Sequence, residues 1–147
     1  MRVTRVLITA AVLVLAACTP SSHHLPKVTE LPTGKWTRIE PGGDTRCVEN
    51  TPYAFWVRPG TDTKLLIYFQ GGGMCWNERN CLQEEGYDHE VNFDEEDPTN
   101  KDNPRNMGGI FDFTDERNPF AAYSFVFIPY CTGDLHWGDQ VASYGIY

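Results

Sequence analysis

The sequence predicts an α/β fold with a mostly parallel sheet and long loops. Two continuous apolar runs, KLLIYF at residues 64–69 and YSFVFI at residues 123–128, are typical of strands buried on both faces of a parallel sheet. A third strand is expected at residues 53–57 (YAFWV), where aromatic and β-branched side chains precede a Pro-Gly turn. No segment after residue 35 has the pattern of a long amphipathic helix. We therefore expect few helices to cover the sheet and some of its apolar surface to stay in contact with water.

The first residues have the features of an export signal. Arg2 and Arg5 precede an apolar run that is too short for a comfortable membrane span and that leads into Leu-Ala-Ala-Cys at residues 15–18. That tetrad resembles a bacterial lipobox, in which Cys18 would receive a lipid and become the first residue of the mature chain. The alternatives are an ordinary signal peptide and a run of small residues that ends in a Cys by chance.

Three parts of the chain follow from this interpretation. We predict a lipoprotein signal peptide at residues 1–17, a lipid-anchored tether rich in Pro, Ser and Thr at 18–35, and one domain at 36–147. Two or more acyl chains hold a protein stably on a membrane. The expected location is therefore the bacterial cell envelope, with the domain exported and lipid-anchored.

The mature chain would be strongly acidic. The whole sequence has 12 basic and 20 acidic residues, and loss of residues 1–17 removes two Arg, which leaves a formal net charge of −10. Nucleic acid is disfavoured as a partner, because binding it requires Lys and Arg to displace counterions. Residues 84–102 contain nine of the acids and are expected to form a solvated insertion loop. EF-hand spacing is missing there, and a looser calcium site is the alternative.

Four cysteines remain once Cys18 is assigned to lipid, and in an oxidising compartment they suggest two disulfides. Three pairings are possible. We favour Cys75–Cys81, which closes a short local loop, and Cys47–Cys131, which ties the start of the domain to a later strand. Zinc is the competing interpretation, but Cys-x5-Cys is not a familiar zinc spacing and no His lies beside it at ligand spacing. No metal and no cofactor are predicted.

The glycines Gly71, Gly72 and Gly73 follow the strand expected at residues 64–69. Without Cβ atoms, they let other groups approach the backbone closely and make unusual φ and ψ angles accessible. Three interpretations compete: a tight turn, a phosphate-binding loop, and an oxyanion hole that stabilises negative charge with backbone N–H groups. Both standard phosphate-loop patterns, GxxxxGK[ST] and GxGxxG, are missing from the sequence.

Four motifs occur in order between residues 65 and 138: LLIYFQGGGMCWNERNC, GIFDF, NPF and FVFIPYCTGDLHWG. Together they resemble the pectin acetylesterase/Notum family of carboxylic ester hydrolases, with GGG-x-CW and PYCTGD-x-H-x-G the most specific. The resemblance implies an α/β-hydrolase-like fold, of which this chain would be the incomplete N-terminal portion. It also implies a Ser, Asp and His triad that acts on acyl esters, such as acetyl groups on a polysaccharide.

The resemblance assigns roles to several residues. Gly72 and Gly73 would supply the N–H groups of an oxyanion hole, with Gly71 allowing the turn, and the Cys75–Cys81 bridge would hold this loop. Met74 stands where many plant-type members have Trp, which would alter the shape of the pocket.

Four residues of PYCTGDLHWG are expected to be structural. Asp134 and His136 should lie at the carboxyl end of the sheet, where they are expected to be hydrogen-bonded supports rather than a catalytic acid and base. Tyr130 and Trp137 are expected to pack, and lining of the pocket is the alternative for both.

No catalytic residue is identified in this chain. The sequence has no Gly-x-Ser-x-Gly elbow, and Ser143 lacks a preceding strand and a glycine at the right offset. We therefore expect the triad to follow residue 147 in a longer polypeptide. The alternative function is a non-catalytic surface lipoprotein that binds a glycan or a cation.

Overall fold

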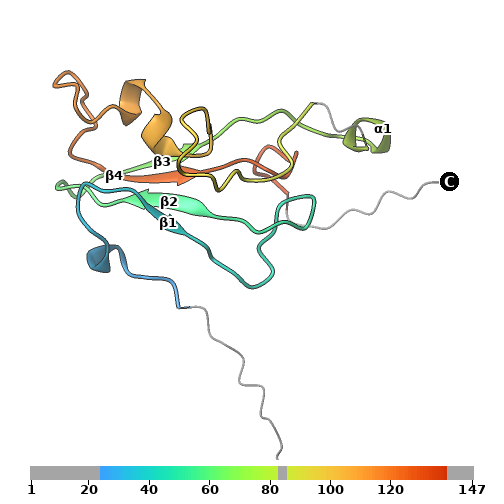
Figure 1. The fold of residues 1–147 in the computed structure, drawn as a ribbon, viewed down its shortest axis with the longest axis horizontal. Coiled ribbons are helices and arrows are strands. Elements are labelled where there is room, and N and C mark those ends of the chain that lie inside the picture. Colours follow the sequence, from blue (N-terminus) through green and yellow to red (C-terminus); the bar gives the residue numbers. More distant parts are fainter. Residues whose placement is uncertain (1–23, 83–85, 139–147) are drawn as a thin grey trace, which may run out of the picture.

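The computed structural model of the chain describes residues 24–82 and 86–138 (Figure 1). The predicted signal peptide, the lipid site Cys18 and Ser143 lie outside these residues. The described residues form four strands, a one-turn α-helix and three 3₁₀ turns. These are β1 (Thr37–Ile39), β2 (Phe55–Arg58), β3 (Leu65–Phe69), β4 (Ser124–Ile128), α1 (Glu78–Cys81), and the 3₁₀ turns Val28–Glu30, Pro104–Asn106 and Gly109–Phe111.

The four strands form a mixed sheet in the order β1-β2-β4-β3. β3 and β4 are parallel, whereas β2 is antiparallel to both β1 and β4. The expectation of a mostly parallel sheet is therefore wrong. The physical reason is the length of the connections, because two parallel strands need a crossover of a dozen or more residues. Residues 70–123 are long enough to make β3 and β4 parallel. Residues 59–64 are too few to make β2 and β3 parallel. The sequence prediction also missed β1.

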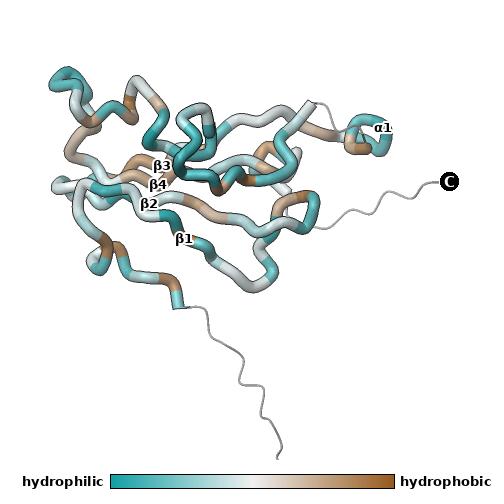
Figure 2. The backbone as a smooth tube through the Cα atoms, in the orientation of Figure 1, coloured by the Kyte–Doolittle hydropathy of each residue, from teal (hydrophilic) through white to brown (hydrophobic). Residues whose placement is uncertain are grey.

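One face of the sheet forms the core. Trp56 of β2 and Phe125 and Phe127 of β4 are almost fully buried on this face, because alternate residues of a strand point to the same side. The segment between Met107 and Tyr123 covers them. It contributes Phe111, whose ring centroid lies 5.9 Å from that of Phe125 and 5.8 Å from that of Phe127. In Figure 2, β3 and β4 appear as hydrophobic segments beside hydrophilic loops.

The opposite face is open along β3. Leu65, Ile67 and Phe69 keep 50–58% of their surface exposed. The expectation that residues 64–69 are buried on both faces is therefore wrong. Their exposure agrees with the expectation that a shortage of helices leaves apolar surface in contact with water. Each of these side chains forgoes roughly half of the 1.5–3 kcal/mol that full burial of an apolar side chain provides.

The acidic segment is more ordered than the expected solvated loop. Asn100, Asp102 and Asn103 are at most 2% exposed, and their side chains bond to nearby backbone. Asn100 Nδ2, for example, donates to the carbonyls of Asn92 at 3.0 Å and Asp94 at 2.6 Å. Asn and Asp side chains can thus satisfy the backbone groups of an irregular segment without a helix or sheet.

Both favoured disulfides are present. Cys47 pairs with Cys131 and Cys75 with Cys81, at Cα–Cα distances of 5.1 and 4.8 Å. The two bridges favoured from the sequence are therefore formed. Among residues 24–82 and 86–138, no helix is long and apolar enough to cross a bilayer.

Candidate functional site

The glycine loop, residues Gly71 to Gly73, lies where β3 ends. Because β3 and β4 are parallel, the loop that follows β4 lies at the same end of the sheet as the glycine loop. The N–H of Cys75 donates to the carbonyl of Gly133 at 2.8 Å and joins the two loops directly. Residues far apart in the sequence are thereby brought to one place.

The N–H groups of the glycine loop have no acceptor within the described residues: no hydrogen bond there uses Gly71, Gly72 or Gly73 as a donor. The carbonyl of Gly72 does accept a hydrogen bond, from the N–H of Asp88 at 2.7 Å, and Gly73 pairs with Tyr87 in an isolated antiparallel bridge. The loop is thus fixed through its carbonyl side while its donors remain available.

Two of these positions require glycine. A Cβ on Gly72 would collide with the ring of Tyr130 and the carboxylate of Asp88. A Cβ on Gly73 would collide with the carbonyl of Gly86, and the φ of Gly73 is +82°, a value that side chains disfavour. Gly71, in contrast, faces open space. The tight packing is therefore at the second and third glycines.

The charge of Asp88 beside the loop is balanced by an ion pair. Its Oδ1 is paired with the ammonium group of Lys101, while its Oδ2 is buried without a hydrogen bond in the described part of the chain. A lone carboxylate here would oppose an anion at the glycine amides, since like charges repel. Lys101 reduces that repulsion.

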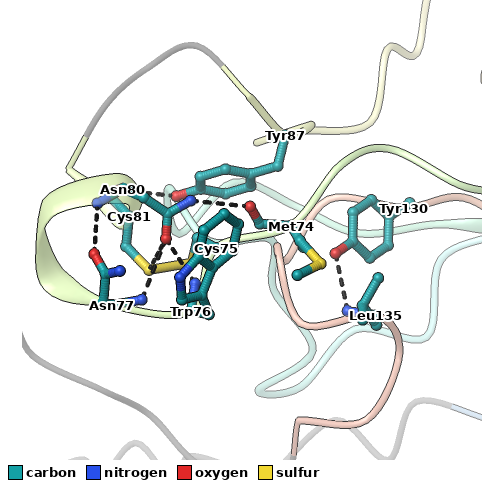
Figure 3. Close-up of a disulfide and its surroundings, with 9 residues drawn as sticks. All are labelled: Met74, Cys75, Trp76, Asn77, Asn80, Cys81, Tyr87, Tyr130 and Leu135. Atoms are coloured by element: carbon teal, nitrogen blue, oxygen red, sulfur yellow. Dashed lines mark hydrogen bonds between the residues drawn. A yellow bond between two sulfur atoms is a disulfide. The ribbon is translucent and has the colours of Figure 1, made fainter.

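The disulfide Cys75–Cys81 closes the segment after the glycines, and Asn80 supports it (Figure 3). Asn80 Oδ1 accepts from the N–H of Trp76 at 2.7 Å, and its Nδ2 donates to the carbonyl of Met74 at 3.1 Å. Asn77 caps the N-terminus of α1 by accepting from the N–H of Asn80 at 3.0 Å. The one-turn helix α1 is therefore capped at its N-terminus by Asn77 and tied at its last residue, Cys81, by the disulfide.

Gln70, which sequence reasoning missed, joins three segments at the base of the loop. It is 7% exposed, and its Nε2 donates to Asp102 Oδ1 at 2.9 Å and to the carbonyl of Lys101 at 3.1 Å. Its Oε1 accepts from the N–H of Tyr130 at 3.0 Å. Asp102 in turn accepts from the N–H of Asn92 at 2.8 Å. A signal was available, because residue 70 continues the core-facing alternation of residues 66 and 68 with a polar side chain that must find partners.

Asp134 and His136 are hydrogen-bonded in the loop after β4. The carboxylate of Asp134 accepts from the hydroxyl of Thr132 at 2.5 Å and from the N–H groups of His136 at 3.0 Å and Gly138 at 2.9 Å. Burial acts to raise the pKa of Asp134, but these hydrogen bonds outweigh it and hold the pKa below its ordinary value. The Nε2 of His136 lies 2.9 Å from the carbonyl of Gln70. Both side chains therefore have the supporting contacts that the sequence interpretation gave them.

Two aromatic residues differ in burial. Tyr130 is 1% exposed, and its hydroxyl accepts from the N–H of Leu135 at 2.9 Å, so it packs as expected. Trp137 is 87% exposed, so the expectation that it packs is wrong for the described residues. Trp76 is also largely exposed, at 67%. Both indoles belong to the loops that follow β3 and β4.

A cavity of about 260 Å³ is lined by residues at the end of β3 and in the loop that follows β4. Phe69, Tyr53, Arg46 and His136 are among its lining residues, whereas none of the three glycines is. The hydroxyl of Tyr53 donates to the carbonyl of Pro129 at 3.2 Å, and burial raises the pKa of Tyr53 to about 12. Within residues 24–82 and 86–138, no group of three or more His, Cys, Asp or Glu side chains is arranged to hold a metal ion.

Comparison with known proteins supports the resemblance seen in the motifs. The family model for pectinacetylesterase matches residues 37–145. A curated relative, the palmitoleoyl-protein carboxylesterase NOTUM of Schmidtea mediterranea, is 31% identical over 102 residues, a match that covers 67% of this chain. The chain spans 19% of that relative's length. No solved structure matches the chain. The matched region contains all four strands, both disulfides and the glycine loop, and the chain belongs to the pectinacetylesterase family.

Proposed function

We propose that this chain is the part of a carboxylic ester hydrolase that supplies the oxyanion hole, with acyl esters such as O-acetyl groups of a polysaccharide as substrates. The observation that carries the proposal is the glycine loop, whose N–H groups have no acceptor among the described residues. Such donors stabilise the negative charge of a tetrahedral intermediate, and the loss of one costs about 3–4 kcal/mol in comparable hydrolases. Family membership supports the reaction class.

The nucleophile is proposed to come from polypeptide beyond these residues. The 147-residue sequence has no Gly-x-Ser-x-Gly elbow. Oxyanion donors alone do not attack an ester, because that step needs an activated nucleophile and a base. The complete site would therefore combine this glycine loop with a Ser, an acid and a His from a later part of the same hydrolase.

The cellular location is proposed to be the bacterial cell envelope, with Cys18 as the lipid attachment site. The two disulfides support export, because disulfides persist mainly in oxidising compartments. Metabolic labelling with a radioactive fatty acid tests the anchor. Label should enter the unmodified chain and be lost in Cys18→Ala.

Hydrolysis of p-nitrophenyl acetate tests the function. The 147-residue chain is expected to show no turnover above the uncatalysed rate. A version extended through adjoining DNA that encodes Gly-x-Ser-x-Gly and a later His is expected to turn over, and replacing that elbow Ser by Ala should abolish the activity. Turnover by the short chain that disappears in Ser143→Ala would contradict the proposed origin of the nucleophile. An extended version that folds with the elbow but does not hydrolyse acyl esters would contradict the esterase function.

A further inference from the structure

Two peptide groups of the glycine loop are held by hydrogen bonds to their carbonyl oxygens. The carbonyl of Gln70 is 2.9 Å from His136 Nε2, and the carbonyl of Gly72 accepts from the N–H of Asp88 at 2.7 Å. The described residues have no cis peptide bonds, so the N–H of each peptide group points opposite to its C=O. These hydrogen bonds therefore fix the directions of two donors, the N–H groups of Gly71 and Gly73.

The peptide group between Gly71 and Gly72 is held differently. No hydrogen bond within the described residues involves the carbonyl of Gly71 or the N–H of Gly72. This middle group can turn only by rotating about bonds next to two fixed groups. Its orientation thus depends on how firmly His136 and Asp88 hold its neighbours.

His136 reaches Gln70 from a strained backbone. Leu135 and His136 have φ values of +57° and +59°, a left-handed conformation that is unfavourable for non-glycine residues. The hydroxyl of Tyr130 accepts from the N–H of Leu135, and Asp134 accepts from the N–H of His136, so the conformation is held from two sides. Strain of this kind persists where the surrounding structure imposes it, often at functional sites.

The imidazole is also oriented by two aromatic rings. Its centroid lies 5.1 Å from that of Phe69 and 4.9 Å from that of Tyr130. Because a carbonyl oxygen only accepts hydrogen bonds, Nε2 of His136 must carry the proton that lies between it and Gln70. One neutral tautomer and the imidazolium both meet this requirement.

From these contacts we infer that His136 is a positioning residue for the glycine loop: its Nε2–H holds the Gln70 carbonyl and thereby fixes the direction of the Gly71 N–H. Asp88 holds the other end through its backbone. The significance for catalysis rests on the proposed function, since donors that are oriented before charge develops need no reorganisation in the transition state.

Nuclear magnetic resonance tests the inference without any turnover. Gln70-Gly71 is the one Gln-Gly pair in the sequence, so a full chain labelled with carbonyl-¹³C glutamine and ¹⁵N glycine reports this peptide group alone. Long-range ¹H–¹⁵N correlations of the unmodified chain should show a protonated Nε2 on His136. His136→Phe keeps an aromatic ring but removes the donor. It should move the Gln70 carbonyl resonance upfield and change the residual dipolar coupling of the Gly71 N–H by several times the experimental error.

Matched variants separate positioning from general packing. His136→Gln keeps an N–H donor at similar reach and should restore both signals. Trp137→Ala, at an exposed neighbour, should leave them unchanged, and the couplings of Gly34 and Gly60 should stay constant in every variant.

Several results would overturn the inference: an unprotonated Nε2, an unchanged Gly71 coupling in His136→Phe, or equal changes at Gly34 and Gly60. Should His136→Phe not fold, the protonation state of Nε2 in the unmodified chain decides. Because none of these signals depends on hydrolysis, a failed esterase assay would leave the inference intact, and a failed inference would leave the esterase proposal intact.

Discussion

Removal of the Cys47–Cys131 disulfide should destabilise the domain far more than removal of Cys75–Cys81. The first bridge joins residues 84 apart in the sequence and the second joins residues 6 apart. For closed loops of these lengths, the chain-entropy relation gives about 4.5 kcal/mol for the long bridge and about 2.2 kcal/mol for the short one. Since small domains have only about 5–15 kcal/mol of stability in total, the long bridge accounts for a large share.

The packing around the long bridge adds to its effect. Cys47 and Cys131 are buried with Val91 in a second apolar cluster, and the N–H of Val48 donates to the carbonyl of Cys131 at 3.0 Å. Replacing both cysteines by Ala would leave unfilled space in this cluster, in addition to raising the conformational entropy of the unfolded chain.

Urea unfolding followed by tryptophan fluorescence measures the difference. The double variant Cys47→Ala/Cys131→Ala should unfold at a much lower urea concentration than Cys75→Ala/Cys81→Ala, with the unmodified chain highest. Equal midpoints for the two double variants, or a lower midpoint for the local one, would refute the argument from loop length.

Two further predictions concern the glycine loop and the open sheet face. Gly73→Ala should lose about 1–2 kcal/mol from its positive φ alone, and more from the collision with Gly86, whereas Gly71→Ala should stay within about 0.5 kcal/mol of the unmodified chain in the same urea assay. A Gly73→Ala variant as stable as Gly71→Ala would contradict the requirement for glycine. Ile67→Lys should reduce concentration-dependent self-association in analytical ultracentrifugation, because Ile67 is half exposed on an apolar face, while Thr63→Lys adds the same charge outside that face and should not. Chains that remain monomeric at all concentrations would contradict this second prediction.

Two strands could be predicted because each is a short continuous run of apolar residues. The disulfides could be predicted because an exported protein enters an oxidising compartment. The apolar runs at residues 64–69 and 123–128 coincide with β3 and β4, since such runs have few ways to leave water. The cysteine pairing was favoured from an expected oxidising environment and from loop length. β1 was missed because a three-residue strand, Thr37–Ile39, has too little sequence to show a pattern.

The relative directions of the strands were predicted wrongly. The continuous apolar runs suggested a parallel sheet, but β2 pairs with β4, which begins 66 residues after β2 ends and lies between β2 and β3. The six-residue link at 59–64 carried the correct information, because it is too short for a parallel crossover.

For the candidate site, the sequence by itself determined the glycine loop, its local disulfide and the family, because these reside in contiguous residues whose chemistry can be read directly. Only the tertiary structure decided how the loop is held. Gln70 meets Asp102, and His136 meets the Gln70 carbonyl, across gaps of 32 and 66 residues. Such partners are chosen by the folded backbone, since a buried polar group bonds with whatever donor or acceptor the sheet brings within reach.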